Sequence, residues 1–215
     1  DGLHAAHPTV TYDVTIKIEH LLKHRELVPR LRDTGCLFVT SAVEAVDDDV
    51  LRRLRKGHTR DDFVRAVALC RAAGVTLAPT FVPFTPWTTL DGYVDLISTI
   101  EQLDLSEEVA PIQLAIRLLV TSDSALLELE DIRTEIAAFD PVSLTYPWRH
   151  RDSRVDALQQ EIMSLVGASA ERPRADVFHE IALLARARAC VAATAPRRRT
   201  SHRVPYMTEA WYCCA

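Results

Sequence analysis

Alternating apolar and polar residues mark several short segments of the chain as β-strands. The clearest is residues 10–20, where Val10, Tyr12, Val14, Ile16 and Ile18 are apolar and every residue between them is polar. Three further apolar runs, at 36–44, 75–82 and 112–120, also have the length and composition of strands. The pattern therefore predicts four strands within the first 120 residues.

Helical patterns separate these four segments. One helix is expected to end at Gly35, and a second to begin with an N-cap at Thr59 and to end at Gly74. A third helical pattern follows the run at 75–82. Alternation of strands and helices predicts right-handed βαβ units and a parallel sheet, so we expect an α/β fold.

Polar residues within the strands favour a barrel over an open sheet. Strands of an open, doubly wound sheet are buried on both faces and are almost continuously apolar. Here polar residues lie toward the C-terminal strand ends, where barrels place their sites: Glu19, Glu44, Thr80 and Arg117. A complete eightfold barrel needs roughly 250 residues. Four units therefore predict half a barrel, open toward a missing N-terminal half or covered by a partner.

The pattern changes after the fourth predicted strand. Two amphipathic helices are expected there, at 153–167 and 176–190. The end of the chain is rich in Arg and Pro and has no clear apolar period, which predicts a flexible tail. We accordingly divide the chain into a partial barrel, a helical extension and a tail, at residues 1–122, 123–190 and 191–215.

Composition limits the classes of function. The net charge of −5 provides no overall basic balance, which argues against nucleic acid as the main partner. No run of about 18 apolar residues occurs, so no membrane-spanning helix is expected. The five cysteines are odd in number and widely spaced, which does not fit a disulfide framework. We therefore expect a protein of the reducing cytoplasm.

The segment EAVDDDVLRRLRKGHT, residues 44–59, carries the most specific motif. Glu44 ends an apolar run, three aspartates lead into a short basic helix, and Lys56 closes that helix before Gly-His-Thr. The segment resembles radical S-adenosylmethionine (radical SAM) enzymes, whose fourth barrel strand ends in Glu or Gln. In that family a short helix follows, and it closes with Arg or Lys before a segment like Gly-His-Thr.

Other segments resemble the same family in the same order. KIEH, residues 17–20, resembles the end of its third strand, PTFVPFTP (79–86) its fifth and AIRLLV (115–120) its sixth. The family's Cys-x-x-x-Cys-x-x-Cys loop, which holds a [4Fe–4S] cluster, does not occur in this sequence. The resemblance thus implies the C-terminal part of a longer enzyme, with cluster ligands upstream, and a fragment that is inactive alone.

The resemblance implies roles for five residues in binding S-adenosylmethionine. Glu19 would hold the ammonium of the cofactor, Glu44 its ribose hydroxyls and Lys56 its carboxylate. The structural alternatives are a solvated carboxylate, an ion pair and an exposed helix-end lysine, respectively. Thr80 would make a second ribose contact. Arg117 must meet an anion or carbonyl groups, either on the cofactor or on the substrate.

The last residues carry a separate resemblance. Cys213-Cys214-Ala215 is similar to a Cys-Cys-Ala-Glu-Pro tail, or its selenocysteine form, in a subgroup of radical SAM proteins, although Glu-Pro is absent. Cys213 and Cys214 would act as catalytic thiols, as soft metal or arsenic ligands or as a redox relay. The alternative is an inert terminal pair. For His58 we expect packing or capping rather than catalysis.

The implied function is reductive cleavage of S-adenosylmethionine to a 5′-deoxyadenosyl radical, which abstracts hydrogen from a small-molecule or peptide substrate. Flavodoxin or ferredoxin is the implied electron donor. Two alternatives stay open. One is a non-radical barrel enzyme of the aldolase or hydrolase type that uses Lys17, Glu19 and Arg117 directly. The other is a non-catalytic interaction domain whose tail binds a partner.

Overall fold

The computed structural model describes residues 2–169, 171–192 and 204–206. Most of the predicted tail, including Cys213 and Cys214, lies outside these residues. The described chain falls into two compact units. The first is built from residues up to Phe81 together with Thr99–Ala110, and the second from Val82–Ser98 and the residues from Pro111 to 192. Each unit is described by itself.

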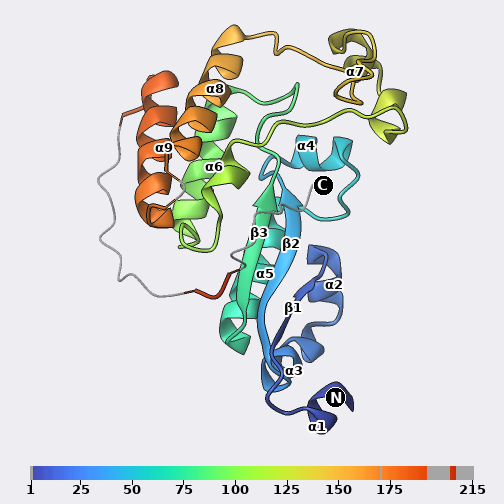
Figure 1. Ribbon diagram of the computed structural model, residues 1–215, viewed down its shortest axis with the longest axis vertical. Coiled ribbons are helices and arrows are strands. Elements are labelled where there is room, and N and C mark those ends of the chain that lie inside the picture. The colour runs from blue at the N-terminus through green and yellow to red at the C-terminus, as the bar shows by residue number, and fades with distance from the viewer. Residues whose placement is uncertain (1, 170, 193–203, 207–215) are drawn as a thin grey trace. The chain divides into compact units, whose positions relative to one another are not determined.

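The first unit is built on a three-stranded parallel sheet. Its strands are β1 (Tyr12–Thr15), β2 (Cys36–Glu44) and β3 (Thr76–Phe81), in the order β1-β2-β3 (Figure 1). β2 therefore pairs on both sides, and it carries the longest apolar run. The register between β2 and β3 shifts between Ala42 and Glu44, so the ladder is irregular at the C-terminal end of β2.

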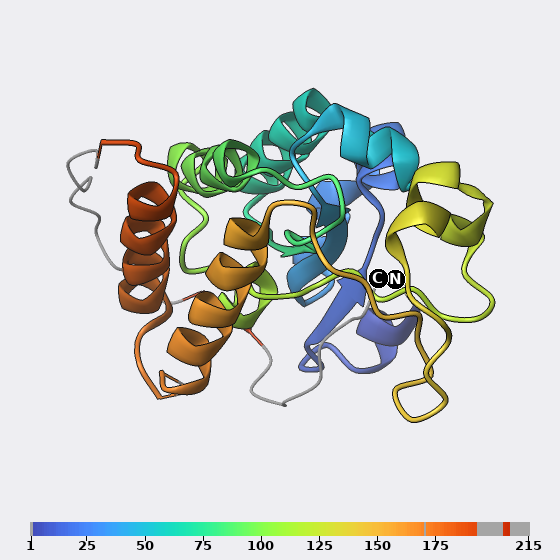
Figure 2. The ribbon, with the colours of Figure 1, turned by 90° about the horizontal axis from the view of Figure 1, so that it is seen from above.

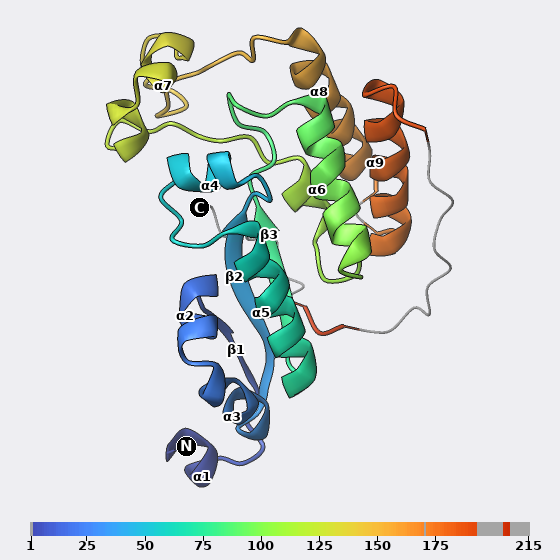
Figure 3. The ribbon, with the colours of Figure 1, turned by 180° about the vertical axis from the view of Figure 1, so that it is seen from behind.

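Helices cover one face of this sheet. They are α2 (Ile18–Lys23), α3 (Val28–Asp33) and α5 (Arg60–Ala73), and α5 lies over the sheet in Figure 3. Phe63 of α5 and Phe81 of β3 are fully buried, and their rings meet edge to face at 6.0 Å. The unit also contains α1 (Gly2–Ala6), the short 3₁₀ helix η1 (Arg25–Leu27) and α4 (Asp48–Arg53).

The boundaries predicted for the helix after Lys56 are confirmed at α5. Thr59 is its N-cap, and its hydroxyl and backbone exchange hydrogen bonds with Asp62 in a complete capping box. Gly74 follows the last turn with φ of 70°, the left-handed conformation in which glycine commonly ends helices. Local sequence signals are sufficient here because each cap is satisfied within three residues.

The second unit is largely helical. α6 (Leu90–Gln102) begins in it and runs into the first unit. Its other elements are η2 (Pro111–Leu114), η3 (Ala125–Glu128), α7 (Glu130–Glu135), α8 (Ser153–Gly167) and α9 (Arg174–Arg188). None of the helices in the described ranges is both long and apolar enough to cross a membrane.

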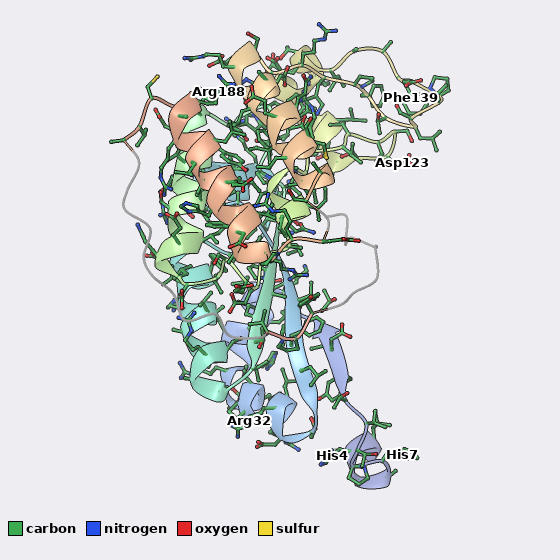
Figure 4. The ribbon with its side chains drawn as sticks, turned by 60° about the vertical axis from the view of Figure 1, so that its left-hand side comes forward. His4, His7, Arg32, Asp123, Phe139 and Arg188 are labelled. Carbon is green, nitrogen blue, oxygen red and sulfur yellow. The ribbon has the colours of Figure 1, made fainter. Side chains whose placement is uncertain are left out.

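The two predicted amphipathic helices are present as α8 and α9, which lie side by side (Figure 2). Val155, Leu158 and Ile162 of α8 are buried at helical spacing, as the pattern predicts. Arg188, the last residue of α9 (Figure 4), donates to Glu161 of α8 at 2.7 Å. The predicted division at residue 122 stays a prediction.

The first predicted strand is shorter than its alternating pattern. Only Tyr12–Thr15 is a strand, and the chain turns into α2 at Ile18, so Glu19 lies in the first turn of a helix rather than at a strand end. Ile18 and Leu21 explain the difference. They lie three residues apart and are both buried, which is the spacing of a helix packed on one face. Ile18 fits both patterns, and burial of Leu21 favours the helix.

The fourth predicted strand, at 112–120, is wrong. Pro111–Leu114 forms the 3₁₀ helix η2, and within the described chain the rest of the run makes one parallel bridge, between Arg117 and Phe84. Leu118 donates its N–H to the carbonyl of Phe84 at 2.8 Å. Most of the run is buried or half-buried, with Leu119 exposed, and a short apolar segment is buried in many conformations. Apolar composition alone could not distinguish them.

Thr59→Ala tests whether the capping box fixes the start of α5. The substitution removes the hydroxyl that accepts from Asp62 N–H, so the free energy of unfolding should fall by about 1 kcal/mol. Urea denaturation followed by circular dichroism measures this loss. Thr9→Ala, at an exposed turn residue outside any helix, is the matched control and should unfold like the original chain. Equal losses in both variants would show that the box contributes nothing.

Candidate functional site

Glu44 is the centre of the candidate site. It is the last residue of β2, and it is only 1% exposed. Its φ of 70° lies in the left-handed region, which few residues other than glycine adopt. Such a conformation costs on the order of 1–3 kcal/mol and is found most often where function requires it. The strand therefore ends in a strained backbone conformation, and the carboxylate of Glu44 lies in a buried environment.

One oxygen of this carboxylate is paired and the other is not. Lys56 Nζ lies 2.9 Å from Glu44 Oε1, and the two side chains are 23% and 2% exposed. Glu44 Oε2 is buried and has no hydrogen-bond partner among the residues that the structure describes. Leaving a buried acceptor unsatisfied costs about 1–3 kcal/mol, and such atoms are rare in native proteins. Oε2 is therefore a strong hydrogen-bond acceptor that a ligand with hydroxyl donors would use.

Burial and Lys56 act on the ionisation of Glu44 in opposite directions. Removal from water raises the pKa of Glu44, because the charged form loses hydration. The hydrogen bond and the positive charge of Lys56 lower the pKa and partly offset that rise. The ionised carboxylate therefore depends on its partner.

The segment between β2 and α5 is shaped to return Lys56 to the strand end. Asp47 caps α4 by accepting from the N–H groups of Asp49 and Val50 at 2.8 and 3.2 Å. The chain then leaves α4 through Arg55 and Gly57, both with positive φ, 51° and 72°. Two left-handed residues within three positions reverse the backbone sharply and carry Lys56 back over Glu44.

His58 ties this turn to the strand. Its ring is buried, and Nε2 lies 3.2 Å from the carbonyl oxygen of Val43, the residue before Glu44. A carbonyl only accepts, so Nε2–H is the donor. Burial is the main cause that lowers the pKa of His58, which keeps the ring neutral. His58 therefore has the packing role expected from the sequence.

Glu19 approaches the same turn from α2. A Cβ added at Gly57 would lie 2.8 Å from Oε2 of Glu19, so the carboxylate rests against the backbone directly after Lys56. Lys17 Nζ and His20 Nε2 each lie 3.6 Å from its other oxygen. Glu19 is a helix residue and not a strand end, but the fold still places it beside the predicted site.

Thr80 lies next to Glu44 on the neighbouring strand. It is half-buried and pairs with Ala42, and the following residue, Phe81, pairs with Glu44. The structure thus gathers four of the five predicted cofactor-binding residues, Glu19, Glu44, Lys56 and Thr80, around the C-terminal ends of β2 and β3 and the turn above them. Their roles toward a cofactor stay predictions.

Arg117 lies in the second unit and is engaged there. Its Nη1 lies 2.6 Å from Asp156 Oδ1, its Nη2 donates to the carbonyl of Trp148 at 2.7 Å, and the guanidinium stacks 3.5 Å above the Trp148 ring. The anion and the carbonyl that an inward arginine requires therefore come from the chain itself. Sequence reasoning missed both partners because they follow 31 and 39 residues later, without a motif.

No cluster-binding group is found in the part of the chain that the structure describes. There, no three or more His, Cys, Asp or Glu side chains are grouped so that they could hold a metal ion. The predicted thiols Cys213 and Cys214 lie outside the described residues. Cys70 differs from a reactive cysteine, because burial raises the pKa of its thiol to about 11 and makes that thiol unreactive.

A known protein family matches the part of the chain that contains this site. Residues 8–97 match the family model of the Radical SAM superfamily. The match contains Glu19, Glu44, Lys56 and Thr80, and it ends before Arg117. Among curated proteins, none matches the chain significantly.

Solved structures of one enzyme share the fold of this chain. The cobalamin-dependent S-adenosylmethionine radical enzyme OxsB, solved with aqua-cobalamin and S-adenosylmethionine bound, aligns over 83% of this chain with a TM-score of 0.63 and 13% identity. Its apo, selenomethionine-labelled form aligns over 83% with a TM-score of 0.59 and 12% identity. The chain spans 34% of the length of those proteins. At this identity the likeness shows the fold, and the predicted α/β partial barrel is confirmed.

Gly57→Ala tests the close approach of Glu19 to the turn. The new Cβ would sit in a left-handed conformation, which costs about 1–2 kcal/mol, and would also press on the carboxylate of Glu19. We expect a lower free energy of unfolding by urea denaturation, and partial recovery in Glu19→Ala/Gly57→Ala, where the clash is absent.

Two controls separate these effects. Gly74→Ala has nearly the same φ, and its new Cβ would lie 3.3 Å from Arg32 Cδ rather than against a carboxylate, so it reports the conformational cost with a milder contact. Gly2→Ala meets no atom within 4 Å and should be neutral. If Glu19→Ala/Gly57→Ala recovers none of the free energy of unfolding lost in Gly57→Ala, the Glu19 carboxylate does not contact this turn.

Proposed function

We propose that this chain supplies part of the S-adenosylmethionine site of a radical SAM enzyme. The observation that carries the proposal is Glu44, a strained, buried strand-end carboxylate. Within the described part of the chain, one of its oxygens has no hydrogen-bond partner. Its place within residues 8–97, which match the Radical SAM superfamily, supports the same assignment. A structural ion pair alone would account for Oε1, but it leaves the strain and Oε2 unexplained.

The residues present fit the chemistry of S-adenosylmethionine. The cofactor offers a ribose diol, an ammonium, a carboxylate and an adenine. An ionised Glu44 would accept from the ribose hydroxyls through Oε2, because charged acceptors make the stronger hydrogen bonds. Glu19, more exposed at 39% and beside the same turn, would hold the ammonium. Thr80 on the neighbouring strand would add a hydroxyl contact to the ribose.

The remaining chemistry belongs to the whole enzyme. When bound to a [4Fe–4S] cluster and reduced, S-adenosylmethionine supplies a 5′-deoxyadenosyl radical, and the protein supplies binding and orientation. We propose that flavodoxin or ferredoxin provides the electron and that a small molecule or peptide is the substrate. The thiols of Cys213 and Cys214 are proposed to act on that substrate. This chain alone is expected to be inactive.

Anaerobic reconstitution of the full-length protein tests the reaction class. We expect about four irons and four sulfides per chain, with the visible absorption of a [4Fe–4S] cluster. Reduction with dithionite in the presence of S-adenosylmethionine should then release 5′-deoxyadenosine. A protein that binds no iron under these conditions, or that binds it without cleaving the cofactor, would exclude radical SAM chemistry.

Glu44→Ala, in the same protein, tests the residue that carries the proposal. Loss of a charge-assisted hydrogen bond costs about 1.5–3 kcal/mol, so affinity for S-adenosylmethionine should fall about tenfold to a hundredfold. Isothermal titration calorimetry measures it, and circular dichroism verifies the fold. Glu26→Ala, at an exposed glutamate on η1, is the control and should bind normally. Affinity within twofold of the original in Glu44→Ala would show that Glu44 is structural.

A further inference from the structure

Lys56 is paired with Glu44. Its ammonium reaches Glu44 Oε1 at 2.9 Å, and its side chain is itself mostly buried, at 23% exposed. Because an ammonium has three N–H donors, a contact between Lys56 and a ligand would be made while Lys56 stays on Glu44, whose side chain is 2% exposed. Removing one partner from a buried ion pair is strongly unfavourable, because the other charge is left without compensation.

Other titratable groups lie near this turn. Burial is the main cause that lowers the pKa of His58, which favours the neutral ring, and that ring donates to the carbonyl of Val43. Glu19 adds negative charge beside Gly57, and its own cationic neighbours are Lys17 and His20. Among the described residues, Lys56 is the cation whose hydrogen bond and charge lower the pKa of Glu44.

We propose that Lys56 is a positioning residue that acts through Glu44, holding the buried carboxylate ionised on Oε1 so that Oε2 stays available as an acceptor. This assignment rests on the proposed function and adds one part to it. The family resemblance implies that Lys56 contacts the carboxylate of S-adenosylmethionine. The geometry adds an indirect effect on binding, which acts through Glu44.

The two assignments differ in their dependence on pH. Burial raises the pKa of Glu44, and without Lys56 the pKa should rise further. The ionised form is present above the pKa and is lost as pH falls through it. Lys56→Gln should therefore bind well at high pH and lose affinity as pH falls. If Lys56 acted only through direct contact with the ligand, the loss would be the same at every pH.

The first measurement follows the carboxyl group without any ligand. Glutamate labelled with ¹³C at the side-chain carboxyl is introduced into the full-length protein, and Glu44→Gln assigns the Glu44 signal. We expect the Glu44 titration midpoint in Lys56→Gln to lie at least about one pH unit above that of the original protein, with Lys56→Arg close to the original. An unchanged midpoint in Lys56→Gln would overturn the proposal.

The second measurement is the affinity for S-adenosylmethionine between about pH 5.5 and 9, in the reconstituted protein. At each pH the affinity of Lys56→Gln is divided by that of the original protein. This ratio of affinities removes the contribution from titration of the cofactor itself. This ratio should lie within about threefold of one above both Glu44 midpoints, fall as pH drops through them, and level off about tenfold lower when the midpoints differ by about one unit. Lys56→Arg should restore binding, and Lys23→Gln, at an exposed lysine of α2, should change nothing.

Each outcome decides one point. A loss in Lys56→Gln that is equal at all pH values would overturn the indirect role and return Lys56 to direct contact. If the original protein binds no S-adenosylmethionine at any pH, the proposed function is wrong. The carboxyl titration then still decides whether Lys56 controls the charge of Glu44.

Discussion

The ion pair between Lys56 and Glu44 is the interaction on which the architecture of the site depends. A distance of 2.9 Å between residues twelve positions apart fixes the path of everything between them. β2 must end with Glu44 in a left-handed conformation, α4 must stop at Arg53, and the chain must turn back through Arg55 and Gly57. Each of these features costs free energy when taken alone. Together they place one cation on one buried carboxylate.

The surrounding structure makes that arrangement rigid. Asp47 caps α4 before the turn, the Thr59 capping box begins α5 after it, and His58 anchors the middle to the carbonyl of Val43. Glu19 then closes against Gly57 from α2. A carboxylate held in this way pays little ordering entropy when it binds a ligand, because its position and rotamer are already set. Preorganisation of this kind is what a cofactor site requires.

Local signals in the sequence predicted the parts of the fold that are satisfied locally. The caps of α5 lie within three residues of their partners, and the motif from Glu44 to Lys56 is contiguous, so both could be identified. The three strands that were correctly placed are those whose apolar runs are buried in one parallel sheet. Where the same apolar pattern fits both a strand and a helix, the sequence could not decide between them. Ile18 fits a strand and a helix equally, so α2 was missed and Glu19 was placed at a strand end.

The sequence could not show which residues far apart in the chain contact each other. Nothing near Arg117 indicates that Asp156 and Trp148 will satisfy it, because those residues are brought to it only by packing of the second unit. The same holds for the pairing of Lys56 with Glu44 itself. The motif identified both as site residues, but only the structure shows that they contact each other and that Oε2 of Glu44 has no partner among the described residues.

The central claim is that Glu44 Oε2 is the acceptor for the ribose of S-adenosylmethionine. A crystal structure of the full-length protein with its cluster and S-adenosylmethionine bound tests it most directly. The account predicts a ribose hydroxyl within hydrogen-bond distance of Oε2, with Lys56 still on Oε1. A ribose bound elsewhere, with Oε2 still lacking a partner, would contradict it.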